Sequence, residues 1–91
     1  DTQGIMDQIM DYMKIDNSEA FTKLEMQLHP ETMGRVVIEI TSRNGELTAQ
    51  ITTQNEAVRA ALESQIVSLK ENLNDQGLRV ENVQVTVIPC L

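Results

Sequence analysis

The chain has 91 residues, one tyrosine, one phenylalanine, no tryptophan and a net charge of −7. This length allows one hydrophobic core but not two, and with so few aromatic residues the core must be aliphatic, with methionine filling gaps. The seven cations are scattered and lack interleaved aromatic residues, which argues against nucleic-acid binding, and no apolar run reaches the length needed for insertion in a membrane.

Residues 2 to 14 are predicted to form an amphipathic helix, followed by a polar connector over residues 16–19. Its apolar side chains recur at helical spacing, and polar side chains occupy the other side. The apolar stripe comprises Ile5, Met6, Ile9, Met10 and Met13. Such a Met-rich stripe either packs on the domain's own sheet or binds another protein chain. We expect it to pack in the core. Residues 1–19 are therefore expected to be a helix and connector that precede an α+β domain over residues 20–91, within a single globular unit.

A first strand is predicted over residues 23 to 28, because Leu24, Met26 and Leu28 alternate with polar residues. Pro30 cannot extend a sheet ladder, but its fixed φ suits the start of a helical turn. We therefore expect a single turn of helix over residues 30–33, with Glu31 near its positive end.

A second strand should start directly after Gly34, where a positive φ can end the turn without a steric penalty. Val36, Ile38 and Ile40 alternate with less apolar neighbours there. Residues 28–38 are thus predicted to form two strands joined by a fixed bend. This pattern indicates a structural role and not a catalytic one.

Asn44-Gly45 predicts a tight type I′ hairpin, since this turn needs positive φ at both central positions. A third strand follows, with an inner row of Leu47, Ala49 and Ile51. A long helix then starts at a cap, for which Thr53 and Asn55 compete. Its large apolar residues repeat at helical spacing at Val58, Leu62, Ile66, Leu69 and Leu73.

The last strand is predicted over residues 83 to 87, and a bulge at Glu81-Asn82 would explain why Val80 is out of phase with Val83. The predicted fold is α+β: a four-stranded mixed sheet with one long helix packed on it, a one-turn helix between the first two strands, and an N-terminal amphipathic helix. The strand order is not readable from the sequence.

Catalytic and metal-binding motifs are missing: the sequence has no Gly-rich phosphate loop, HExxH, CxxC or GxSxG. One histidine and one cysteine are too few for most metal sites. Nothing near Cys90 would activate its thiol, and His29 beside Glu31 is more simply a turn residue. We expect no enzyme activity, no metal and no cofactor.

Three ordered segments resemble the C-terminal domain of bacterial flagellar hook-length control proteins. The first is Met26-Gln27-Leu28-His29-Pro30-Glu31, continued by Gly34-Arg35-Val36-Val37-Ile38; the others are residues 55–63 and 69–78. Met26 and Met33 stand where that family more often has leucine. The resemblance runs from about Phe21 to about Ile88. A start at Asp1 without methionine further suggests a fragment of a longer protein.

The resemblance implies a protein-interaction domain that switches the flagellar type III export apparatus from hook-type to filament-type substrates. The implied partner is the cytoplasmic domain of an export-gate membrane protein, met in the cytoplasm before the parent protein is secreted through the export channel. The expected contact residues are those of the signature: Leu28, His29, Pro30, Glu31, Gly34, Val36 and Ile38. Val36 and Ile38 could act only through the fold.

The acidity of the chain favours a partner with a basic surface, and we expect the domain to be a monomer. Two alternatives remain open from the residues alone. One is a small regulatory ligand-binding domain, an alternative that rests only on the analogy with other small α+β domains. The other is a homo-oligomerisation module that uses the Met-rich helix.

Overall fold

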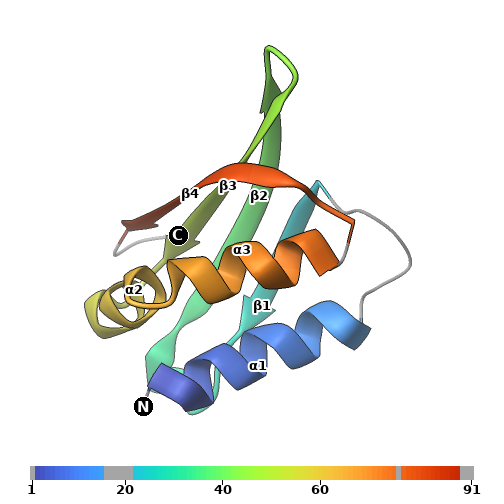
Figure 1. Cartoon of the computed structure of the whole chain (residues 1–91). Coiled ribbons are helices and arrows are strands. Elements are labelled where there is room, and N and C mark those ends of the chain that lie inside the picture. The colour runs from blue at the N-terminus through green and yellow to red at the C-terminus, as the bar shows by residue number, and fades with distance from the viewer. Residues whose placement is uncertain (1, 16–21, 76, 89–91) are drawn as a thin grey trace.

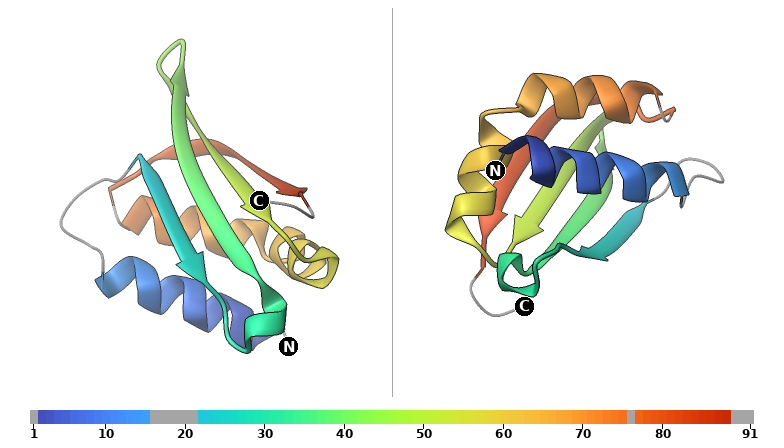
Figure 2. Two further views of the ribbon diagram at one scale, coloured as in Figure 1. Left: turned by 180° about the vertical axis from the view of Figure 1, so that it is seen from behind. Right: turned by 90° about the horizontal axis from the view of Figure 1, so that it is seen from below.

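The computed structural model describes residues 2–15, 22–75 and 77–88 of the chain. A four-stranded sheet forms one layer, and the helices lie together on one of its faces (Figures 1 and 2). The elements in chain order are α1 (Thr2–Ile15), β1 (Lys23–Gln27), the 3₁₀ helix η1 (Glu31–Met33), β2 (Arg35–Arg43), β3 (Glu46–Thr53), α2 (Glu56–Glu63), α3 (Ile66–Asp75) and β4 (Val80–Val87). The predicted α+β class and the predicted element order are confirmed.

The sheet is mixed, as predicted, and its strands follow the order β1-β2-β3-β4. The pairs β1–β2 and β2–β3 are antiparallel, whereas β3 and β4 are parallel and are connected through α2 and α3. Leu47 pairs with Val80 and the next residue, Thr48, pairs with Asn82, so Glu81 is the extra residue of a bulge. The predicted change of phase before Val83 is therefore real.

The hairpin between β2 and β3 turns at Asn44 and Gly45, whose φ angles are 54° and 83°. Both are positive, as the type I′ turn predicted from Asn-Gly requires. The hairpin forms the tip of the sheet, at the end away from η1 (Figure 1).

Helix α1 packs its apolar stripe onto the sheet rather than presenting it to another chain. Ile5, Met6, Ile9 and Met13 are buried and belong to the same core as the strands. The prediction that this stripe packs in the core is confirmed. The stripe is therefore not exposed for pairing with a second copy of the domain. The remaining buried apolar residues of the core are Leu24, Met26, Leu28, Val36, Ile38, Ala49, Ile51, Val58, Ala61, Leu62, Leu69, Leu73, Leu78 and Val80.

The predicted long helix covers the expected span but consists of two segments, α2 and α3, that run in different directions (Figure 1). Between them, the Ser64 hydroxyl donates to the carbonyl of Ala61 at 2.7 Å, a local bond that competes with continued helix. Each segment thereby turns its own leucines toward the sheet, Leu62 from α2 and Leu69 from α3.

Of the two candidate caps, Asn55 is the one used: its side-chain oxygen accepts from the amides of Ala57 and Val58 at 2.7 and 3.2 Å. In α2, Arg59 hydrogen-bonds Glu56, which lowers the pKa of that carboxyl. At the end of α3, the Leu78 amide donates back to the Leu73 carbonyl at 2.9 Å.

The helices described by the structure are all too short or too polar to cross a lipid bilayer. The polar connector over residues 16–19, Phe21 and Cys90 lie outside the described residues.

Candidate functional site

We call residues 28–34, which join β1 to β2, the elbow. Its ends are held together because the Leu28 amide donates to the Gly34 carbonyl at 2.9 Å. Between them, the Met33 amide donates to the Pro30 carbonyl at 2.9 Å, and the Gly34 amide donates to the Glu31 carbonyl at 3.0 Å. The peptide bond between His29 and Pro30 is cis. The elbow is thus an ordered bend with a single 3₁₀ turn, as the sequence predicts.

Gly34 has a backbone conformation that other residues rarely adopt, with φ 79° and ψ −164°. A side chain here would also lack space: a Cβ atom would lie 2.9 Å from the Gln54 Oε1 atom and 3.2 Å from its Cβ. The same Gln54 oxygen accepts a hydrogen bond from the Arg35 amide at 2.9 Å. The glycine therefore allows the bend, and it also leaves room for Gln54, in the segment before α2, to pack against the elbow.

Side-chain amides from neighbouring segments fix the elbow further. The Gln27 Nε2 atom donates to the carbonyls of Leu28 and Gly34, both at 3.0 Å. On the far side, Asn55 donates to the Thr32 carbonyl at 3.3 Å while it caps α2. The bend is therefore tied both to the end of β1 and to the start of α2.

Gln8 joins the elbow to α1. Its Nε2 atom donates to the His29 carbonyl at 2.7 Å, and its Oε1 atom accepts from the His29 amide at 2.7 Å. The carboxamide thus satisfies both backbone groups of one residue, as an opposite residue in an antiparallel hydrogen-bonded pair does. Through this contact α1, which the sequence signature leaves out, becomes part of the site.

Replacing Gln8 with alanine should destabilise the domain by about 1 kcal/mol, since it removes two hydrogen bonds between neutral groups at a partly solvated position. Exchange of the His29 amide should accelerate at the same time. Chemical denaturation and residue-resolved hydrogen exchange measure the two effects. Gln3→Ala is the matched control, because Gln3 bonds only to Asp7 within α1; equal losses in both variants would show that Gln8 does not hold the elbow.

The seven residues of the signature separate into two groups by burial. Leu28, Val36 and Ile38 lie in the core with at most 1% of their surface exposed. His29, Pro30 and Glu31 are exposed at the bend, and Gly34 is half-buried. Six of the seven therefore lie in or next to the elbow, whereas Ile38 lies farther along β2, opposite Leu24 and Ile51. Only the three turn residues are exposed to solvent.

An open hollow lies beside the elbow, between α1 and β1. It is lined by Gln8, Asp11, Tyr12, Met26, Gln27, Leu28 and His29. Tyr12 is 39% exposed there. Tyrosine is one of the residue types that often anchor a contact between proteins.

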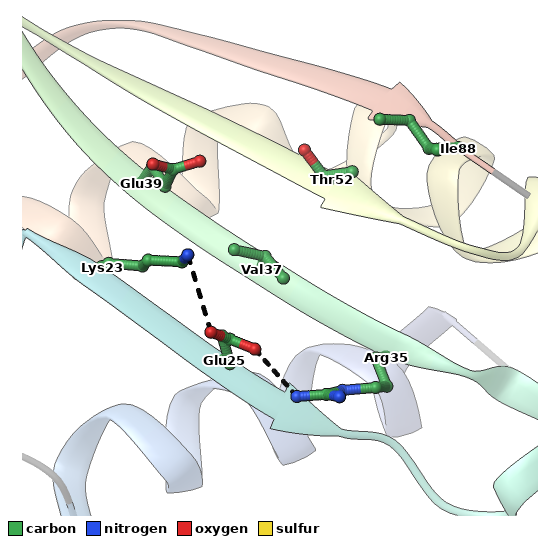
Figure 3. Close-up of a pocket in the computed structure, with 7 residues that line it drawn as sticks. All are labelled: Lys23, Glu25, Arg35, Val37, Glu39, Thr52 and Ile88. Atoms are coloured by element: carbon green, nitrogen blue, oxygen red, sulfur yellow. Dashed lines mark hydrogen bonds and ion pairs between the residues drawn. The ribbon is translucent and has the colours of Figure 1, made fainter. Parts of the chain in front are cut away.

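A second hollow lies on the face of the sheet that the helices leave uncovered (Figure 3). On β1, Glu25 lies between two cations, 2.8 Å from the Arg35 guanidinium and 3.7 Å from the Lys23 ammonium group. Val37 and Ile88 contribute apolar surface to this hollow. The three charged groups are half-exposed, and ion pairs of this kind add little stability. The described side chains here show no nucleophile paired with a base.

Two comparisons with known proteins bear on the family and on the fold of the chain. The family model of flagellar hook-length control protein FliK matches residues 11–89, a region that includes the last five residues of α1 as well as the elbow. The crystal structure of the PscP SS domain is similar with a TM-score of 0.53 and 16% sequence identity, over 97% of this chain and 94% of that chain. This likeness concerns the fold. No curated protein matches the chain at a significant level.

Proposed function

Because the chain belongs to the flagellar hook-length control protein family, we propose that it is the domain that switches export specificity. In this proposal it binds the cytoplasmic domain of the export-gate membrane protein and changes the exported substrates from hook-type to filament-type. It acts in the cytoplasm, and its parent protein leaves through the flagellar export channel. The domain works by binding and not by catalysis.

One observation supports this proposal most: the family signature is divided between a core and a presented turn. Its apolar members, Leu28, Val36 and Ile38, are buried in the core. Its polar members at His29 and Glu31, with Pro30 between them, are exposed on that bend. A turn that is held by the three amide side chains of Gln8, Gln27 and Asn55 loses little conformational freedom on binding, which favours affinity.

We therefore assign direct contact with the export gate to His29, Pro30 and Glu31. The other signature residues affect binding indirectly, because they keep the elbow in place; these are Leu28, Gly34, Val36 and Ile38. Switching additionally requires that the domain bind two states of the gate with different affinities, because a ligand with equal affinity for both states shifts nothing.

Replacing Glu31 with lysine should weaken binding to the export-gate cytoplasmic domain on the order of tenfold, which corresponds to about 1.4 kcal/mol. The reason is that the substitution reverses a charge at the centre of the proposed contact, where the acidic domain meets a basic surface. Titration calorimetry with the purified cytoplasmic domain measures the affinity, and filament assembly in cells reports the switch.

Glu46→Lys provides the matched control. It makes the same change of charge at an exposed position of the hairpin, at the opposite end of the sheet from the elbow (Figure 1). If both substitutions weaken binding equally, only the net charge matters; if neither does, the elbow is not the contact.

A further inference from the structure

The sheet has two outer strands, β1 and β4, because the order is β1-β2-β3-β4. Along such a strand, every second residue directs its backbone N–H and C=O groups away from the sheet. These free edges can pair with another chain, and proteins normally protect them. The two edges of this domain differ in that respect.

The edge of β1 carries several protections. The strand has only five residues, and Lys23 and Glu25 place charged side chains along it. Beyond its end, the Gln8 carboxamide occupies both backbone groups of His29. Short length and charge are the usual means of discouraging strand addition.

The register of β4 defines which of its backbone groups are free. Ile88 donates its amide to the Thr53 carbonyl at 2.8 Å, and Thr53 pairs with Val87. In a parallel pair, this places the backbone groups of Thr86 and Gln84 toward β3 as well. The amides and carbonyls of Val83, Val85 and Val87 therefore point away from β3, toward the outer edge.

Beyond the bulge at Glu81, the described residues of this second edge lack the usual protections. The stretch from Asn82 to Ile88 contains no charged residue, no proline and no glycine. Four of its seven residues are β-branched valine or isoleucine, a composition with high strand propensity. The inner valines are only half-buried, and Ile88 is 42% exposed. Natural sheets rarely leave a neutral strand of this length open unless something pairs with it.

We propose that the outer edge of β4 is a docking site for an extended segment of a protein partner, which adds to the sheet as a fifth strand. Such a segment pairs through its backbone with Val83, Val85 and Val87, and it places apolar side chains at alternate positions beside these valines. A second copy of the domain is disfavoured as occupant because two chains of net charge −7 repel each other. The segment is therefore neutral or basic.

The inference rests on the proposed function, since the partner tested is the export-gate cytoplasmic domain. The end of β4 at Val87 lies at the same end of the sheet as the elbow, because Val87 pairs with Thr53, and Thr53 with Val36. One partner can thus contact both the elbow and the β4 edge.

Residue-resolved hydrogen exchange of the domain, alone and with the export-gate cytoplasmic domain, tests this directly. Alone, the amides of Gln84, Thr86 and Ile88 should exchange slowly, and those of Val83, Val85 and Val87 rapidly. Adding the partner should slow the second set at least tenfold, giving protection along the whole strand. If the partner protects the elbow but leaves the three valine amides unchanged, the β4 inference is wrong and the proposed function stands.

A pair of substitutions at Val85 provides a second test. Proline is tolerated on an edge strand where the N–H faces solvent, so Val85→Pro removes one docking donor without removing a bond to β3. Val85→Ala loses similar packing but keeps the donor. We expect about tenfold weaker binding for the proline variant and less than threefold for the alanine variant.

Equal weakening by both variants would overturn the inference, because the edge donor would then not matter. Concentration-dependent protection of the valine amides without any partner would also overturn it, in favour of a second copy as occupant. Should the export-gate domain not bind the unmodified chain at all, the proposed function and this inference both fail. If Val85→Pro does not fold, the exchange measurement on the unmodified domain still decides.

Discussion

Replacing Gly34 with valine is expected to destabilise the domain strongly and to abolish the export switch. The φ of 79° and ψ of −164° at this position suit glycine almost alone, and forcing another residue into such a region costs roughly 1–3 kcal/mol. The new side chain would also displace Gln54, whose oxygen accepts from the Arg35 amide; losing that bond adds about 1 kcal/mol. Chemical denaturation measures the loss of stability, and filament assembly measures the switch.

Gly45→Val separates the effect of backbone strain from the effect on the elbow. Gly45 also has a positive φ of 83°, but a Cβ atom there meets nothing within 4 Å. This control should lose stability without losing the switch in the fraction that remains folded. If Gly34→Val folds with normal stability and still supports filament assembly, the elbow does not carry the function that we assign to it.

The elements of the fold could be predicted from the sequence because each of them has a local signal. The alternation of Leu24, Met26 and Leu28 defines β1, Asn44-Gly45 defines the hairpin, and the change of phase at Glu81 defines the bulge. In each case neighbouring residues alone decide the backbone conformation. The same local logic located the elbow between Pro30 and Gly34.

The strand order, the break after α2 and the tethers of the elbow could not be predicted, because they depend on contacts between distant segments. Gln8 and His29 are separated by 21 positions, and a surface glutamine has no pattern that reveals its partner. Likewise, the predicted long helix breaks between Glu63 and Ile66, where the Ser64 hydroxyl donates to the Ala61 carbonyl, and periodicity does not detect this break.

A family signature also mixes residues that fold with residues that bind. Val36 and Ile38 belong to the signature as much as His29 and Glu31 do, yet the first pair is buried and the second is exposed. Only burial distinguishes them. The functional prediction therefore gains its precision from the structure: substitutions of the buried pair should lower stability first, and substitutions of the exposed pair should lower binding first.

Leu62→Ala is expected to lower the free energy of unfolding by about 2–5 kcal/mol, because it removes a buried side chain and leaves a cavity. Leu62 has no exposed surface and packs from α2 into the common core with Val58 and Ala61. Domains of this size are stabilised by about 5–15 kcal/mol in total, so the substitution removes a large share and unfolds part of the population at growth temperature. Chemical denaturation of the purified domain measures the change.

Val67→Ala is the matched control for this prediction. Val67 lies on α3 and is 71% exposed, so its truncation should change stability by less than about 0.5 kcal/mol. Since Leu62 is not part of the elbow, the folded fraction of Leu62→Ala should bind the export-gate domain with unchanged affinity, whereas Glu31→Lys should bind weakly although fully folded. Comparable losses for Leu62→Ala and Val67→Ala would contradict the placement of α2 against the core, and a weaker affinity in the folded fraction of Leu62→Ala would mean that the helices take part in the contact.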